Sequence, residues 1–180
     1  MVLAVAYVLL AIRQHIACWS AAILSAAIYT SLMFRAGLYM QSALQVCYIA
    51  MAIYGWHHWR RGTAGGAPLP VSSWPLRAHV VPLATILVLA LPTGYLLANS
   101  GTASSPYLDA LTGWGAIVTT GMVARKIIQN WYYWFVIDLL SIHLYYAAGL
   151  TLTALLFCLY VVLAVFGYFE WRKELQPVGT

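Results

Sequence analysis

The stretch GLTLTALLFCLYVVLAVFGYFEWR (Gly149–Arg172) repeats an earlier one, GLYMQSALQVCYIAMAIYGWHHWR (Gly37–Arg60), when the chain is shifted by 112 positions without a gap. The shared glycines, tryptophans and arginines are informative inside helices otherwise rich in Leu and Ala. The identities across the repeat are Gly37/Gly149, Leu38/Leu150, Leu44/Leu156, Tyr48/Tyr160, Ala52/Ala164, Gly55/Gly167, Trp59/Trp171, Arg60/Arg172, Arg13/Arg125, Trp19/Trp131 and Leu32/Leu144. This pattern predicts a duplicated helical unit.

The composition indicates an integral membrane protein. Of the 180 residues, 63% are hydrophobic and 7% are charged, whereas a soluble domain is about 45–50% apolar and about 25% charged. The nine Lys and Arg residues are scattered between apolar runs, so they indicate topology in a lipid bilayer and no nucleic-acid partner. The three cysteines have no metal-binding or disulfide spacing, and no cofactor or metal is expected.

Seven stretches have the apolar character of membrane-spanning helices, which need roughly 20 residues each. The first is short, and it begins at Met1 without the charged segment and cleavage site of a signal peptide. The predicted spans are about 1–12, 17–34, 37–58, 79–98, 107–124, 130–147 and 149–170. The sequence therefore predicts an all-α membrane protein with seven transmembrane helices.

The repeat fixes how these helices are grouped. The offset contains four spans, an even number, so the two copies have the same orientation and form a 3+1+3 parallel repeat. The predicted units are repeat 1 (1–59), a loop with the linker helix (60–106), repeat 2 (107–173) and a tail (174–180). Parallel repeats of this kind are typical of transporters that hold their substrate near the membrane midplane.

The basic residues predict the orientation of the protein in the membrane. With seven spans, eight of the nine Lys and Arg residues fall on one side, and only Arg35 lies on the other. Because loops on the cytoplasmic side carry an excess of Lys and Arg, the C-terminus is expected in the cytoplasm and the N-terminus outside.

Asp138 stands deep inside a predicted span, whereas most other ionisable residues stand at span ends. It lies about eight residues into its helix, about 12 Å deep, near the centre of a ~30 Å hydrocarbon core. A carboxylate at that depth costs at least ~2.5–3.5 kcal/mol unless it faces a cavity or a partner. Function is the default hypothesis, and a structural hydrogen bond between helices is the alternative.

The spacing of the neighbouring residues places Asp138 on an inward face. Trp131, Trp134 and Asp138 follow at i, i+3 and i+7, and Ser141 and Tyr145 continue the same helical stripe. An aromatic belt at the membrane interface would explain the tryptophans but not the acid. This stripe is the leading candidate for a substrate site.

A second inward stripe is predicted in the third span, where Gln41, Gln45 and Tyr48 follow at i, i+4 and i+7. Amides in such helices also serve as contacts between helices, so that alternative stays open. The candidate substrate-binding residues are Trp131, Trp134, Asp138, Gln45, Tyr48, Gln41, Tyr145, Asn130 and Tyr160.

Enzyme motifs are missing from the sequence. There is no P-loop, H-E-x-x-H or nucleophile-elbow pattern, and no second catalytic group is evident near Asp138. A membrane sensor or scaffold would not need a buried acid on a tryptophan stripe. A membrane enzyme and a membrane sensor or scaffold are therefore weaker hypotheses than a transporter.

Three segments resemble the PnuC family of bacterial vitamin transporters. They are LQVCYIAMAIYGWHHW, ARKIIQNWYYWFVID with its W-x-x-W, and the repeat that ends in GYFEWRK. The resemblance covers about residues 10–173 and implies a 3+1+3 fold like that of the SWEET sugar transporters. It assigns the family's W-x-x-W to Trp131 and Trp134, its acid to Asp138 and its glutamine to Gln45. The short first span departs from the family pattern.

The resemblance also implies a function, because the best-known family members carry nicotinamide riboside. It implies facilitated diffusion across the bacterial inner membrane, followed by trapping through a cytoplasmic kinase that need not form a stable complex. Tryptophan faces suit the permanent cation of this vitamin, and the span interiors hold no Lys or Arg that would compensate a phosphate. Thiamine, also a cationic heterocycle, or another nucleoside is the alternative. A homo-oligomer is compatible with the sequence, which is silent on that point.

Overall fold

The computed structural model describes residues 2–35, 39–63, 67–100 and 105–175. These segments form seven α-helices and one short 3-10 helix, with no β-strand among them. The elements are α1 (Val2–Ile12), α2 (Ala17–Arg35), α3 (Tyr39–Arg61), η1 (Leu76–His79), α4 (Val80–Ser100), α5 (Pro106–Ala124), α6 (Asn130–Ala147) and α7 (Thr151–Lys173).

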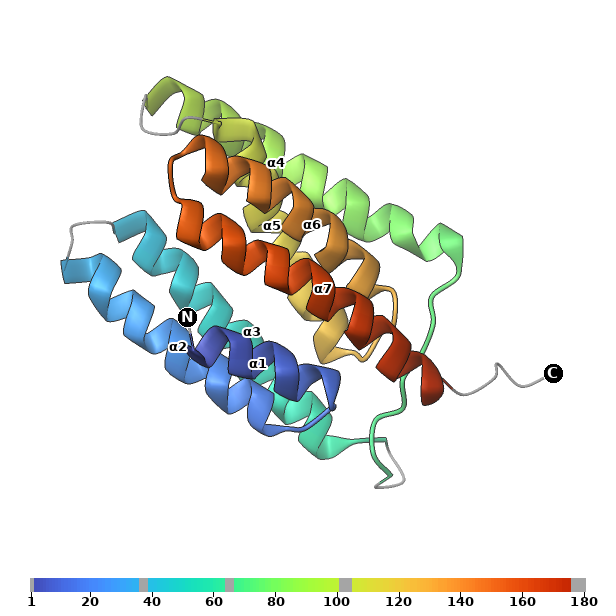
Figure 1. The fold of residues 1–180 in the computed structure, drawn as a ribbon. Helices are drawn as coiled ribbons and strands as arrows, with labels where there is room; N and C mark the ends of the chain where they lie inside the picture. Colours follow the sequence, from blue (N-terminus) through green and yellow to red (C-terminus); the bar gives the residue numbers. More distant parts are fainter. Residues whose placement is uncertain (1, 36–38, 64–66, 101–104, 176–180) are drawn as a thin grey trace.

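The helices form two three-helix units with α4 beside them (Figure 1). Within the first unit α2 packs against α1 and α3, and within the second α6 packs against α5 and α7. The units meet where α3 contacts α5 and where α1 contacts α7, while α4 packs on α5. The 3+1+3 arrangement predicted from the repeat is therefore confirmed.

Within the described residues, three segments are long and apolar enough to cross a membrane by length and composition alone. They are α2, the continuous segment Leu76–Ser100, and α7. Helices α3, α5 and α6 are also 18 residues or longer, but polar side chains lower their hydropathy. Helix α1 is apolar and has 11 residues. Helices α3, α5 and α6 carry most of the polar side chains of the site described below, and this explains why they are less apolar than α2 and α7.

The turn between the first two helices of each unit has the same structure in both copies. Gln14 and Lys126, which are 112 positions apart, have φ values of 52° and 51°. Their backbone N–H groups donate to the carbonyls of Ala11 and Val123 at 3.0 and 2.9 Å. A left-handed conformation costs a non-glycine residue about 1–2 kcal/mol, so its presence in both copies shows that one turn design was duplicated.

Each repeat packs a tryptophan on a glycine of its own third helix. A Cβ atom on Gly55 would lie 2.4 Å from the Trp19 ring, and one on Gly167 would lie 2.6 Å from the Trp131 ring. Only glycine allows this close approach of ring and backbone. One contact that occurs in both repeats thus explains why Gly55/Gly167 and Trp19/Trp131 are identical across the repeat.

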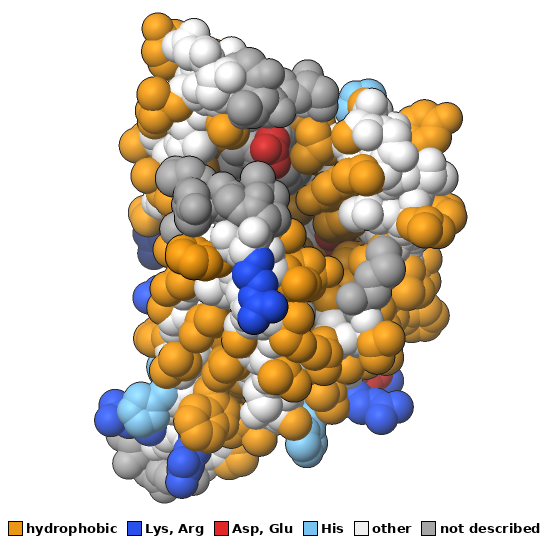
Figure 2. Space-filling model, turned by 90° about the vertical axis from the view of Figure 1, so that its left-hand side faces the viewer, with side chains coloured by type: hydrophobic (Ala, Val, Ile, Leu, Met, Phe, Trp, Pro, Cys, Tyr) orange, Lys and Arg blue, Asp and Glu red, His pale blue; other side chains and the backbone are white. Residues whose placement is uncertain are grey.

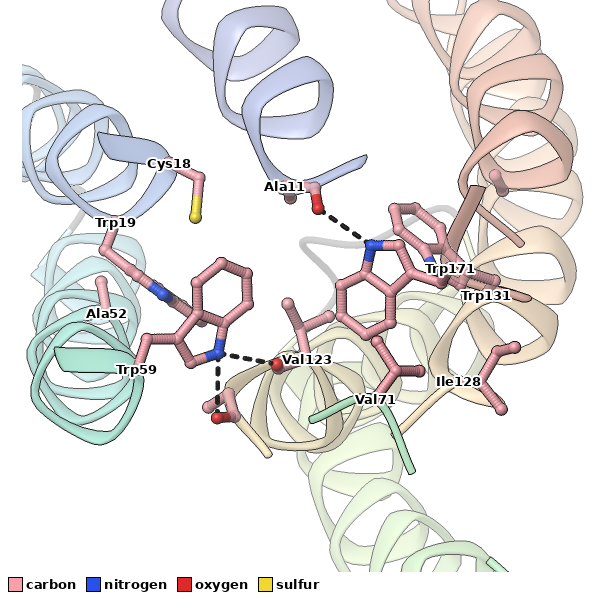
Figure 3. Packing of buried hydrophobic residues seen from close by; sticks show 12 residues of the cluster. Ala11, Cys18, Trp19, Ala52, Trp59, Val71, Val123, Ile128, Trp131 and Trp171 are labelled. Carbon is pink, nitrogen blue, oxygen red and sulfur yellow. Dashed lines mark hydrogen bonds between the residues drawn. The ribbon is translucent and has the colours of Figure 1, made fainter. Parts of the chain in front are cut away.

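Two further tryptophans join the repeats to each other (Figure 3). The indole Nε1 of Trp59 donates to the carbonyls of Val123 and Ala124 at 3.3 and 3.1 Å. The indole Nε1 of Trp171 donates to the carbonyl of Ala11 at 3.0 Å. Both indoles donate to carbonyls in the last turn of a helix, where carbonyls have no intrahelical donor. Each repeat therefore caps the first helix of the other, as an approximate two-fold axis requires.

Candidate functional site

A cavity of about 420 Å³ lies between the two repeats. Its lining residues come from α1, α2, α3, α5, α6 and α7, and many occupy equivalent positions 112 residues apart. These pairs are Ala4/Ala116, Val8/Thr120, Ala11/Val123, Trp19/Trp131, Ala22/Trp134, Ser25/Ile137, Ala26/Asp138, Gln45/Phe157, Tyr48/Tyr160 and Ala52/Ala164. The cavity therefore lies on the pseudo-two-fold axis.

The pairing shows where the two cavity walls differ. Trp134 occupies the position equivalent to Ala22, and Asp138 occupies the position equivalent to Ala26. The small alanines leave room on the first-repeat side for a molecule held by the tryptophan and the carboxylate on the other side. A nearly symmetric scaffold thus carries an asymmetric site.

Seven of the nine predicted site residues line the cavity. They are Trp131, Trp134, Asp138, Gln45, Tyr48, Tyr145 and Tyr160. The side chain of Gln41 lies outside the described residues. Asn130 is fully buried at the start of α6, where its Nδ2 donates to the Ile127 carbonyl at 2.6 Å, and it is not among the lining residues. Its place in the structure is the turn that leads into α6.

Asp138 lines the cavity in the middle of α6 with 3% of its surface exposed. Within the described part of the chain, its carboxylate forms no hydrogen bond and no ion pair. The helix–helix hydrogen bond that was the structural alternative is not seen there. An unpaired carboxylate that faces a cavity is free to meet a ligand.

The sequence-based search missed a second carboxylate in the cavity, that of Asp109. This residue lies in the first turn of α5 and lines the same cavity. Its position near a predicted span end concealed it, because acids at span ends are ordinarily solvated. Since α5 (Pro106–Ala124) ends at the basic turn of Arg125 and Lys126, Asp109 near its start stands at the opposite end of the cavity. Figure 2 shows acidic side chains in a recess between apolar lobes.

Aromatic rings form a continuous wall beside the two acids. Tyr145 stacks on Phe157 with ring centroids 5.1 Å apart, and Phe157 meets Tyr160 edge to face at 5.5 Å. No Lys, Arg or His is among the lining residues that the structure describes. The cavity combines aromatic faces with two carboxyl groups, a combination that suits a cation with a flat ring.

Below the cavity, Lys126 connects the two repeats. It is 7% exposed, and its Nζ donates to Gln14 Oε1 at 2.7 Å. The same Nζ lies 4.8 Å from the ring centroid of Trp59, and Gln14 Nε2 donates to Glu174 Oε2 at 2.8 Å. Burial lowers the pKa of the Lys126 amine, and the nearby Glu174 opposes this shift.

Two parallel three-helix repeats around a central cavity, in a chain of apolar helices, define a membrane transporter. The family model described as "Nicotinamide mononucleotide transporter" matches residues 1–173. The chain belongs to this family, the PnuC family of vitamin transporters. Membership places it among multi-pass membrane transporters rather than enzymes.

Characterised relatives carry different vitamins. The riboflavin/roseoflavin transporter RibM of Streptomyces davaonensis is 28% identical over 142 residues, which cover 74% of this chain and about two thirds (66%) of RibM. The nicotinamide riboside transporter PnuC of Escherichia coli is 23% identical over 183 residues, which cover 88% of this chain and 77% of that protein.

A solved structure shares the fold. The crystal structure of the vitamin B3 transporter PnuC aligns with a TM-score of 0.71 at 20% identity, covering 93% of this chain and 76% of that chain. At this identity the likeness concerns the fold alone.

Proposed function

We propose that this protein is a facilitative carrier for nicotinamide riboside in the bacterial inner membrane. The observation that carries the proposal is a cavity with two carboxylates, several aromatic rings and no basic side chain among its described lining residues. In this proposal the basic end of the molecule, which carries Arg125, Lys126, Arg172 and Lys173, faces the cytoplasm, in line with the distribution of Lys and Arg.

The chemistry of nicotinamide riboside matches the lining groups. Its pyridinium ring is a permanent cation, and such a cation gains about 0.5–2 kcal/mol from each aromatic face it contacts. Trp134 offers that face, and Asp138 offers the opposite charge. The amide of Gln45, on the facing wall, matches the carboxamide of the vitamin.

The charge of the cavity favours the riboside over its mononucleotide. A phosphate would bring about two negative charges into a cavity that already holds Asp109 and Asp138, and it would find no Arg or Lys to pair with. A cytoplasmic kinase that phosphorylates the vitamin would therefore trap it inside the cell. No coupling to an ion gradient is required for net uptake by this route.

Riboflavin is the second candidate, because RibM is 28% identical to this chain. Its flavin ring is flat and would also stack on tryptophan. It is uncharged, however, so the two carboxylates would contribute no charge attraction. Removal of a carboxylate should then affect the two vitamins differently.

A titration of the purified protein distinguishes these substrates. Calorimetry with nicotinamide riboside, its mononucleotide, thiamine and riboflavin is expected to show tightest binding for the riboside, with the mononucleotide at least about tenfold weaker, or about 1.4 kcal/mol. Proteoliposomes should take up the riboside down its gradient without an ion gradient. Tight riboflavin or thiamine binding together with no riboside binding would refute the proposed specificity.

A further inference from the structure

We propose that Lys126 is a positioning residue of the transport cycle, which holds the two repeats together beneath the cavity and must release Gln14 before substrate can leave at the basic end. This rests on carrier activity of the cavity but not on which vitamin it carries. Lys126 is not among the residues that line the cavity. It acts by closing the cavity floor, the end of the cavity that lies next to the turns of Gln14 and Lys126.

The contact lies at the point where the repeats meet. Lys126 belongs to the turn after α5, and Gln14 belongs to the equivalent turn after α1. The 2.7 Å bond from Lys126 Nζ to Gln14 Oε1 therefore spans the pseudo-two-fold axis. A bond with a charged donor is roughly twice as strong as a neutral one, and the amine also lies over the Trp59 ring.

The bond lies directly under the cavity. Ala11 and Val123 line the cavity and also accept the indole bonds of Trp171 and Trp59. The turns of Gln14 and Lys126 begin just after these residues. A path out at the basic end therefore requires the Lys126–Gln14 contact and the neighbouring indole bonds to separate.

One of the two turns is anchored from outside the repeats. Ser72 donates its N–H to the Lys126 carbonyl at 3.0 Å and accepts from the Ile128 N–H at 2.9 Å. The side chain of Gln129 bonds to the backbone of Trp74 through both its oxygen and its nitrogen. The segment 72–74 thus binds the Lys126 turn to the loop before α4.

The Gln14 turn is held differently. In the described part of the chain, its bonds beyond its own repeat are the two side-chain bonds of Gln14, to Lys126 and Glu174, and the Trp171 bond to Ala11. Among the residues that the structure describes, no segment is hydrogen-bonded across it as 72–74 is across the other turn. In this inference the Gln14 turn of repeat 1 therefore moves during opening, while the Lys126 turn stays in place.

Cys18 provides a reporter for this movement. It lies in the first turn of α2, just after the Gln14 turn, and is fully buried. Cys47 and Cys158 are exposed in the structure, so both are replaced by alanine. The rate at which a membrane-impermeant thiol reagent labels Cys18 in sealed vesicles, without substrate, then reports how often the floor opens. A cleavable C-terminal tag reports the orientation of each vesicle preparation.

Lys126→Met keeps the aliphatic length and removes the bond, and it is expected to raise Cys18 labelling from the basic side by about tenfold or more. Gln14→Leu removes the same bond from the other repeat and should give a similar increase. The double variant should exceed neither single variant by much, because both changes break the Lys126–Gln14 bond, which is the contact that joins the two turns. Lys173→Met is the matched control, since the described partner of Lys173 Nζ is Glu170 of its own helix.

Unchanged labelling in correctly folded Lys126→Met and Gln14→Leu proteins would overturn the inference. Equal increases from both sides of the membrane would also overturn it, because they would indicate general loosening of the bundle. If Lys126→Met does not fold, Gln14→Leu decides alone. Since no substrate is present, the result is independent of the vitamin titration and separates a failure of this inference from a failure of the proposed function.

Discussion

Asp138 and Ala26 occupy equivalent positions in the two repeats, yet only the second repeat carries a charge there. After a duplication, both copies would begin alike, and a buried carboxylate costs free energy that only a cavity or a partner can offset. Asp138 faces the cavity without a described partner. At the scale of single residues, this position is where the two copies took on different roles.

Asp138→Asn tests the charge while it keeps the shape of the side chain. We expect binding of nicotinamide riboside to weaken about tenfold, because a bond to a charged group is worth roughly 1.5–3 kcal/mol and a neutral amide keeps only part of that. Binding of uncharged riboflavin should change little. The measurement is calorimetric titration of both vitamins against the variant and the original protein.

Asp109→Asn is the companion variant. Asp109 lines the cavity from the first turn of α5, so its loss should act mainly on attraction of the cation and should be screened by salt. An equal and salt-independent loss in both variants would contradict a distinct role for Asp138.

At the scale of helices, α7 must approach α6 closely enough for Trp131 to reach the cavity wall. The space is provided by Gly167, since any Cβ there would lie 2.6 Å from the Trp131 ring. Trp131 also meets Trp171 edge to face at 5.4 Å, as Trp19 meets Trp59 at 5.4 Å in the other repeat. The helix pair therefore positions one of the rings that line the site.

Gly167→Ala is expected to lower the thermal stability of the protein and to weaken vitamin binding. Overpacking of this kind typically costs about 1–3 kcal/mol, and the ring that must shift is a cavity wall. Gly121→Ala is the control, because its nearest contact is the flexible end of Met51 at 3.3 Å. Differential scanning fluorimetry and calorimetry measure the two effects, and equal behaviour of both variants would contradict the explanation.

Helical periodicity was sufficient to predict the inward face of α6, because Trp131, Trp134 and Asp138 recur at helical spacing. The repeat predicted two parallel three-helix units, which is typical of transporters that hold their substrate near the membrane midplane. The contact between Lys126 and Gln14 had no local signal, because it joins two non-glycine residues in left-handed turns that lie 112 positions apart. Asp109 was missed because the sequence shows only how far a residue lies from the end of its helix. It does not show that the cavity extends to the first turn of α5.

At the scale of the whole molecule, exchanged tryptophan bonds hold the two repeats together. Trp59 extends from repeat 1 to the end of α5, and Trp171 extends from repeat 2 to the end of α1. Both indoles are largely buried (Figure 3). Because a buried indole N–H that lacks an acceptor costs free energy, these bonds contribute to stability in addition to the packing of the rings.

Trp59→Phe and Trp171→Phe each remove an indole N–H and keep an aromatic ring in place. Each loss should cost about 1 kcal/mol for the unmade bond, or roughly 2–4 °C in Tm for a protein of this size. The approximate two-fold axis predicts similar losses for both variants, since both bonds cap the first helix of the opposite repeat. Trp56→Phe is the control, because Trp56 is exposed and contacts Arg60 on its own helix. A loss confined to one of the two buried tryptophans, measured as Tm in the same detergent, would show that the repeats are not held together symmetrically.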